Sequence, residues 1–184
     1  MNCKAKIFKI SKLIFIILGI ISFIGVVIII VVFLYSITFG NRTIENKATK
    51  SDVKFVLNWC NLGSKREYQV LKSYISARSL TGDHLNAYAI EITDITIEEL
   101  TKNNSKWYRA DSLPTILNDV VNFIGDFQYE MPWFPIEHDI KTKDFYIYPC
   151  NLHYYNGNIR RPSAVQIILA KPIDKIIYYI SFKT

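Results

Sequence analysis

The sequence predicts an α+β protein with one N-terminal transmembrane helix and one extracytoplasmic domain, in which two or three helices pack on an antiparallel sheet of about five strands. A long apolar run without charges comes first and predicts the membrane helix. Short runs rich in Ile, Val and Tyr follow and predict the strands, while stripes of apolar residues at helical spacing predict the helices. No residue pattern matches the motif of a known family, so each element rests on its own residues.

The apolar run covers residues 13–39 and contains no charged side chain. A helix of this length spans about 40 Å, which exceeds the ~30 Å hydrocarbon core of a bilayer. The run is also longer than the apolar part of a signal peptide, and its end at 35–40 lacks an Ala-x-Ala cleavage site. We therefore expect an uncleaved transmembrane helix, and a cleaved signal peptide is the alternative.

Lysines on the N-terminal side indicate the orientation. Residues 1–12 carry four lysines and no acid, whereas residues 42–54 mix four basic with two acidic residues. The positive-inside rule favours a cytoplasmic N-terminus. The predicted organisation is a cytoplasmic basic tail at 1–12, a transmembrane helix at 13–39, a stalk at 40–50 and an extracytoplasmic α+β domain at 51–184. In a bacterium this is a single-pass protein of the inner (cytoplasmic) membrane with its domain in the periplasm.

The formal charge of +6 is concentrated near the membrane helix. Of the 22 Lys and Arg residues 7 precede residue 51, together with 1 of the 16 acidic residues, and the remaining 15 of each sign balance. Basic residues beside a membrane helix favour anionic headgroups. The domain lacks the basic surface that nucleic-acid binding needs. We therefore expect the lipid bilayer and a protein as partners, and no nucleic acid.

The elements of the domain follow in order along the chain. Capping residues followed by apolar residues at helical spacing predict helices at 51–62, 96–102 and from 111 or 112 to about 127. Alternating or continuously apolar runs predict strands at 68–79, 85–93, 144–150, 163–170 and 175–182. The last two runs are apolar on successive residues, which is typical of central strands covered on both faces.

Two of the three cysteines belong to the outer domain. Cys60 and Cys150 form an even pair in a compartment that is oxidising if the orientation is right, whereas Cys3 precedes the membrane helix. This pattern predicts a Cys60–Cys150 disulfide. The alternative is two unrelated buried thiols, because free cysteine is among the most buried residue types.

The segment Pro132-Trp133-Phe134-Pro135 is the candidate partner-binding feature, with Trp133 and Phe134 as its residues. Two large aromatic side chains on a backbone that prolines hold extended are ordered before binding, which favours affinity. The alternative is a lid that covers the core and binds nothing.

Catalytic chemistry has little support. His84, His138 and His153 lack the spacing of metal ligands, and the sequence contains neither a Gly-x-Ser-x-Gly elbow nor a phosphate-binding loop. We therefore predict no catalytic, cofactor-binding or metal-binding residues, and no cofactor. The expected function is protein binding at the cell envelope, as a subunit of an envelope complex or a periplasmic protective factor. The alternatives are an anchored hydrolase-like enzyme that uses the loop histidines, and a sensor of a small ligand or lipid.

Overall fold

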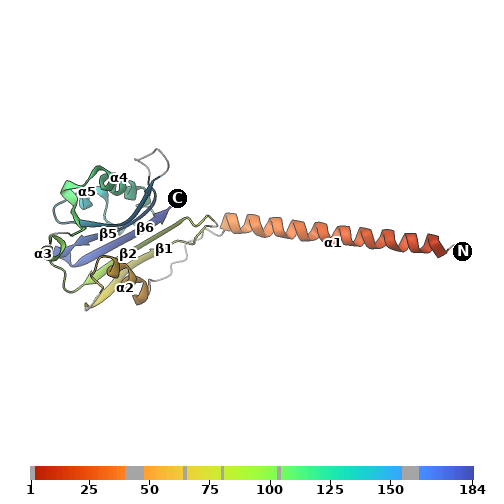
Figure 1. The fold of residues 1–184 in the computed structure, drawn as a ribbon, viewed down its shortest axis with the longest axis horizontal. Coiled ribbons are helices and arrows are strands. Elements are labelled where there is room, and N and C mark those ends of the chain that lie inside the picture. The colour runs from red at the N-terminus through yellow and green to blue at the C-terminus, as the bar shows by residue number, and fades with distance from the viewer. Residues whose placement is uncertain (1–2, 40–47, 64–65, 80, 103–104, 155–161) are drawn as a thin grey trace. The chain divides into compact units, whose positions relative to one another are not determined.

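The computed structural model describes residues 3–39, 48–63, 66–79, 81–102, 105–154 and 162–184. The chain divides into two compact units, Met1–Asn41 and Arg42–Thr184 (Figure 1). The predicted stalk at 40–50 lies mostly outside the described residues, and its last residue already belongs to a helix of the second unit.

The first unit is a single helix, α1 (Cys3–Phe39). Its 24-residue stretch Lys12–Tyr35 contains an 18-residue window with a mean hydropathy of 3.4, and none of this window is buried against protein. Apolar side chains that point outward on every side require an apolar environment. The helix is therefore consistent with a membrane anchor or a secretion signal.

The second unit is built on one antiparallel sheet with the strand order β1-β2-β6-β5-β4-β3. Its strands are β1 (Tyr68–Ile75), β2 (His84–Ile92), β3 (Tyr108–Arg109), β4 (Tyr146–Tyr154), β5 (Pro162–Lys171) and β6 (Ile176–Lys183). The α+β class and the antiparallel sheet are thus as predicted. The sixth strand, β3, has two residues and pairs only with Tyr146 and Ile147, which is too short to leave a pattern in the sequence.

The two central strands are buried on both faces, as their unbroken apolar character predicts. In β5, Ile167, Ile168 and Leu169 are fully buried, although successive side chains point to opposite faces. Each face of the sheet therefore has a hydrophobic core of its own, and helices must cover both faces (Figure 1).

One face, which we call the α4 face, is covered by α4 (Thr115–Ile124), η2 (Gly125–Phe127) and α5 (Glu137–Ile140). The apolar side of α4, with Leu117, Val120 and Ile124 buried, packs on this face as predicted. The predicted helix start at 111 or 112 is wrong, because those residues belong to a 3-10 turn, η1 (Ala110–Ser112). Leu113 stands before a proline and is extended, as such residues tend to be, so the α-helix begins only after Pro114.

The opposite face, which we call the α2 face, is covered by α2 (Lys50–Trp59) and α3 (Ile97–Leu100). Thr49 caps α2 in place of the predicted Ser51. The Thr49 hydroxyl accepts a hydrogen bond from the Asp52 N–H at 3.2 Å, and the Asp52 carboxylate accepts one from the Thr49 N–H at 2.8 Å. The two residues therefore form a reciprocal capping box.

The end of α2 also differs from the expectation of a helix that continues to about Leu62. The helix ends at Trp59, and Asn61 takes the left-handed conformation with φ 62°. The Leu62 N–H donates to the Leu57 carbonyl at 2.8 Å and the Asn61 N–H to the Asn58 carbonyl at 3.2 Å, which is the Schellman arrangement. Asparagine tolerates this conformation, so it ends the helix before Gly63.

Candidate functional site

The segment after η2 closes into tight turns. The Met131 N–H donates to the Phe127 carbonyl at 3.1 Å, and the Phe134 N–H donates to the Met131 carbonyl at 2.9 Å. The expectation of an extended backbone between the two prolines is therefore wrong. Pro132 fits the turn because its fixed φ suits the second position of a four-residue turn.

This turn sends its two aromatic side chains in different directions. Phe134 is 4% exposed and belongs to the core of the α4 face, where its ring meets the Tyr178 ring edge-on at 5.6 Å. Trp133 is half-buried and packs edge-on against Phe134 with 5.8 Å between ring centres. Phe134 thus fixes the turn to the sheet, and Trp133 remains partly accessible at the surface.

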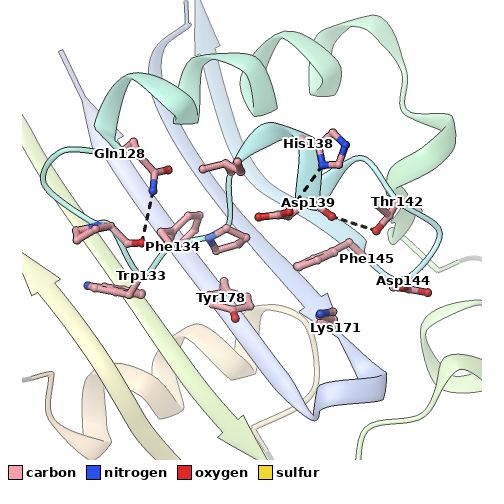
Figure 2. Close-up of a pocket in the computed structure, with 13 residues that line it drawn as sticks. Gln128, Trp133, Phe134, His138, Asp139, Thr142, Asp144, Phe145, Lys171 and Tyr178 are labelled. Atoms are coloured by element: carbon pink, nitrogen blue, oxygen red, sulfur yellow. Dashed lines mark hydrogen bonds and ion pairs between the residues drawn. The ribbon is translucent and has the colours of Figure 1, made fainter.

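Trp133 stands at one end of an open groove with a volume of about 550 Å³. Figure 2 shows Trp133 at one end and Asp144 at the other, with Tyr178 and Phe145 between them. The groove is lined by the turn, α5, the loop after α5 and the neighbouring ends of β5 and β6: Gln128, Pro132, Trp133, Phe134, Pro135, Ile136, His138, Asp139, Thr142, Asp144, Phe145, Lys171 and Tyr178. Phe134 and Phe145 are almost fully buried, so Trp133 and Tyr178 present most of the aromatic surface, and charged groups stand among them.

The single lysine that lines the groove is neutralised by an acid outside it. Lys171 Nζ lies 2.5 Å from Asp174 Oδ2 and stands 5.6 Å from the centre of the Phe145 ring. The hydrogen bond from Lys171 to Asp174 raises the pKa of the lysine. Burial raises the pKa of Tyr178, so its hydroxyl stays protonated and can donate a hydrogen bond into the groove at neutral pH.

The two acids that line the groove have no such partner. Asp139 lies 3.8 Å from the Nδ1 atom of His138, whose side chain is 92% exposed. Among the residues that the structure describes, Asp144 forms neither an ion pair nor a side-chain hydrogen bond. Lys171 forms its ion pair with Asp174, and the charge of Asp144 also acts on it, so the groove combines aromatic surface with two carboxylates and one lysine.

Exposed apolar side chains also occur at, or close in sequence to, the residues that line this groove. Tyr129 follows the lining residue Gln128 and is 96% exposed, Ile136 lines the groove and is 41% exposed, and Ile173 is 67% exposed two residues after Lys171. Apolar surface around a concave site is typical of protein–protein contacts.

The three histidines lie apart. His84 pairs with Lys183, Lys183 with Ala164 and Ala164 with His153, so three strand spacings, about 14 Å, separate the two histidines along one row of the sheet. His84 Nε2 lies 3.1 Å from the buried Ser181 hydroxyl. His153 lines a separate cavity of about 780 Å³, and His138 stands on α5 beside the opposite face.

A metal site needs ligands that converge. Within the described ranges, no group of three or more His, Cys, Asp or Glu side chains could hold a metal ion. The arrangement of the groove instead suits noncovalent binding by aromatic rings and carboxylates.

The predicted cysteine pair lies on the α2 face. Cys60 caps the end of α2 and is 5% exposed within the core of that face, and Cys150 on β4 packs against the same core. Both thiols are unbonded.

The sequence reasoning named Trp133 and missed the residues that complete the groove. Asp139, Asp144, Lys171 and Tyr178 come from a short helix, a loop and two strands. Nothing in their spacing indicates that the segment 128–145 packs beside the β5–β6 connection. The cluster of acids after Trp133 was the only available signal.

No protein-family model matches this chain. Neither the curated proteins nor the solved structures contain a match to it.

Proposed function

We propose that the protein is a single-pass protein of the cytoplasmic membrane whose outer domain binds another protein through the Trp133 groove. The apolar span Lys12–Tyr35 supports the anchor, and the four lysines of residues 1–12 favour a cytoplasmic N-terminus with the domain in the periplasm. A subunit of an envelope complex and a periplasmic protective factor both use a domain of this kind.

The observation that carries the proposal is the combination, in one groove, of a half-buried tryptophan with two carboxylates that form no ion pair with a lysine or arginine among the described residues. Tryptophan is enriched among the residues that dominate binding energy, because a large ring buries apolar area at a small entropy cost. The partner that fits is an extended protein segment with an apolar side chain for Trp133 and Tyr178 and a Lys or Arg for Asp139 and Asp144. A basic side chain is also the group that stacks best on an indole ring.

The other two functions lack a specific observation in their favour. An enzyme based on the loop histidines needs them in one pocket, and His84, His138 and His153 are spread over two faces of the sheet. A lipid sensor needs tyrosines around a void, whereas Tyr88 and Tyr179 on the α2 face pack on each other at 5.3 Å and Tyr179 packs on Trp59 at 5.9 Å.

The test is purification of the full-length tagged protein from its native membranes after crosslinking, with each variant at matched membrane levels. Trp133→Ala should lower recovery of the partner at least about 30-fold, which corresponds to about 2 kcal/mol for a central aromatic contact. Replacing both carboxylates, Asp139→Asn with Asp144→Asn, should lower it about tenfold and weaken its dependence on salt.

The matched controls lie outside the groove. Phe55→Ala removes an aromatic side chain that is 61% exposed on α2, and Asp94→Asn removes an exposed carboxylate after β2. Both should retain the partner. If Phe55→Ala loses the partner and Trp133→Ala keeps it, the binding surface is on the α2 face and the groove assignment is wrong.

A further inference from the structure

Cys60 and Cys150 are 90 residues apart in the sequence but lie on the same face of the sheet. Cys60 is the residue at which α2 ends, and its thiol donates to the Leu57 carbonyl at 3.4 Å. Cys150 lies on β4, and both side chains contact the hydrophobic core of the α2 face.

Cys150 faces α2 by ordinary strand alternation, because Tyr148 two residues earlier pairs with Ile168 of the α2-face core, and a bulge follows at Cys150 itself. Pro149 pairs with Ile167 and Asn151 pairs with Gln166, so Cys150 is an extra residue without a partner on β5. On the other side of β4, β3 reaches only Tyr146 and Ile147. Cys150 therefore stands at a free and adaptable part of the strand, where small backbone shifts cost little.

The charges of both thiols act on the same tyrosine. Burial raises the pKa of Tyr148, and the charges of Cys150 and Cys60 add to this effect. Burial also raises the pKa of Cys60 to about 12, with a further contribution from Cys150. Groups influence each other in this way only when they are close.

We propose that Cys60 and Cys150 form an intramolecular disulfide that fastens α2 to the edge of the sheet. Because α2 is the first element after residues 40–47, the bridge holds onto the sheet the helix that is nearest to α1 in the sequence. The bond closes a long loop, and cross-links of this kind stabilise chiefly by restricting the unfolded chain.

The oxidant is a disulfide of the thiol–disulfide oxidoreductase class. The thiolate of Cys150, the more exposed of the two, attacks one donor sulfur; a mixed disulfide forms and the other donor sulfur leaves as a thiolate. The Cys60 thiolate then attacks the Cys150 sulfur, which breaks the mixed disulfide and releases the second donor thiol. Two cysteines are oxidised, one donor disulfide is reduced, and the two cysteine protons end on the donor thiols.

The burial of the two thiols also determines when the disulfide can form. The pKa of Cys150 is also raised to about 12, so few thiolates exist in the folded domain at neutral pH. An unfolded chain has ordinary thiols with a pKa of about 8.5, which react faster. The bond is therefore expected to form during folding and to resist reductants afterwards.

The test denatures cells that express the full chain directly in the presence of excess N-ethylmaleimide, so that every free thiol, buried or exposed, is alkylated before peptide mass analysis. The inference rests on the proposed orientation, so the expected result is alkylation at Cys3 alone, with Cys60 and Cys150 joined. After reduction, both become alkylated and the thermal midpoint falls by about 10 °C. Cys60→Ser and Cys150→Ser should each leave one reactive thiol in the domain, whereas Cys3→Ser should leave the bond intact.

A second measurement separates failure of the pairing from failure of the orientation. The purified full-length protein is unfolded, reduced and refolded with a mixture of reduced and oxidised glutathione. If the thiols are free in cells but the bond forms on refolding, the pairing is supported and the proposed orientation is contradicted. If no intramolecular bond forms in either case, the pairing itself is overturned.

Discussion

The contrast between Phe134 and Trp133 gives the sharpest stability prediction. Phe134 is 4% exposed and its ring contacts the rings of Trp133 and Tyr178. A buried Phe→Ala change costs about 3–5 kcal/mol, because it removes apolar burial and leaves a cavity. Trp133 keeps part of its ring exposed and borders an open groove, so Trp133→Ala leaves no enclosed cavity and should cost less, about 2 kcal/mol.

The measurement is thermal and urea unfolding of the full-length protein in detergent, followed by far-UV circular dichroism because one variant lacks a tryptophan. At roughly 3–5 °C per kcal/mol for a domain of this size, Phe134→Ala should lower the midpoint by about 10–20 °C and Trp133→Ala by about 6–10 °C. If Trp133→Ala is the more destabilising change, Trp133 is the core residue and the division between the two side chains is refuted.

Two further predictions concern the α2 face. Thr49→Ala should destabilise the domain by about 1 kcal/mol, because it removes the capping box with Asp52. Ser51→Ala should have little effect on the same unfolding curve. The reverse order would mean that Ser51 is the cap. Burial raises the pKa of both Tyr88 and Tyr179 to about 12. Since a tyrosine in the unfolded chain ionises near pH 10, the unfolded state holds fewer protons between about pH 10 and 12. Stability is therefore complete below pH 10 and falls through this window, by about 2 kcal/mol for each tyrosine. Replacing both with Phe should flatten the pH dependence of urea unfolding, and an unchanged slope in that double variant would show that these phenols do not cause it.

The sequence predicted the class of fold because its patterns are local. In strands β5 and β6 the unbroken apolar run, and in α4 the apolar residues at helical spacing, predict burial without any knowledge of the rest of the chain. The element ends were less predictable where two signals compete. Thr49 and Ser51 are both good caps, and only Thr49 has an acid three residues later to complete the box.

The groove was less predictable because it is a product of tertiary contacts. Trp133 stood out in the sequence, but its separation from the buried Phe134 depends on the turn between Met131 and Phe134. Lys171 has no local feature that relates it to Asp139, since thirty-two positions separate them in the chain. The placement of Cys60 and Cys150 on one face of the sheet likewise depends on tertiary contacts, since 90 positions separate them in the chain.

The most direct measurement of the central claim is photo-crosslinking from the groove in intact membranes. A photoreactive amino acid is placed at position 133, and at position 55 as the matched exposed site on α2. The account predicts one protein adduct from position 133 that disappears when Asp139 and Asp144 are both replaced by Asn, and none from position 55. Equal adducts from both positions, or an adduct from position 55 alone, would contradict it.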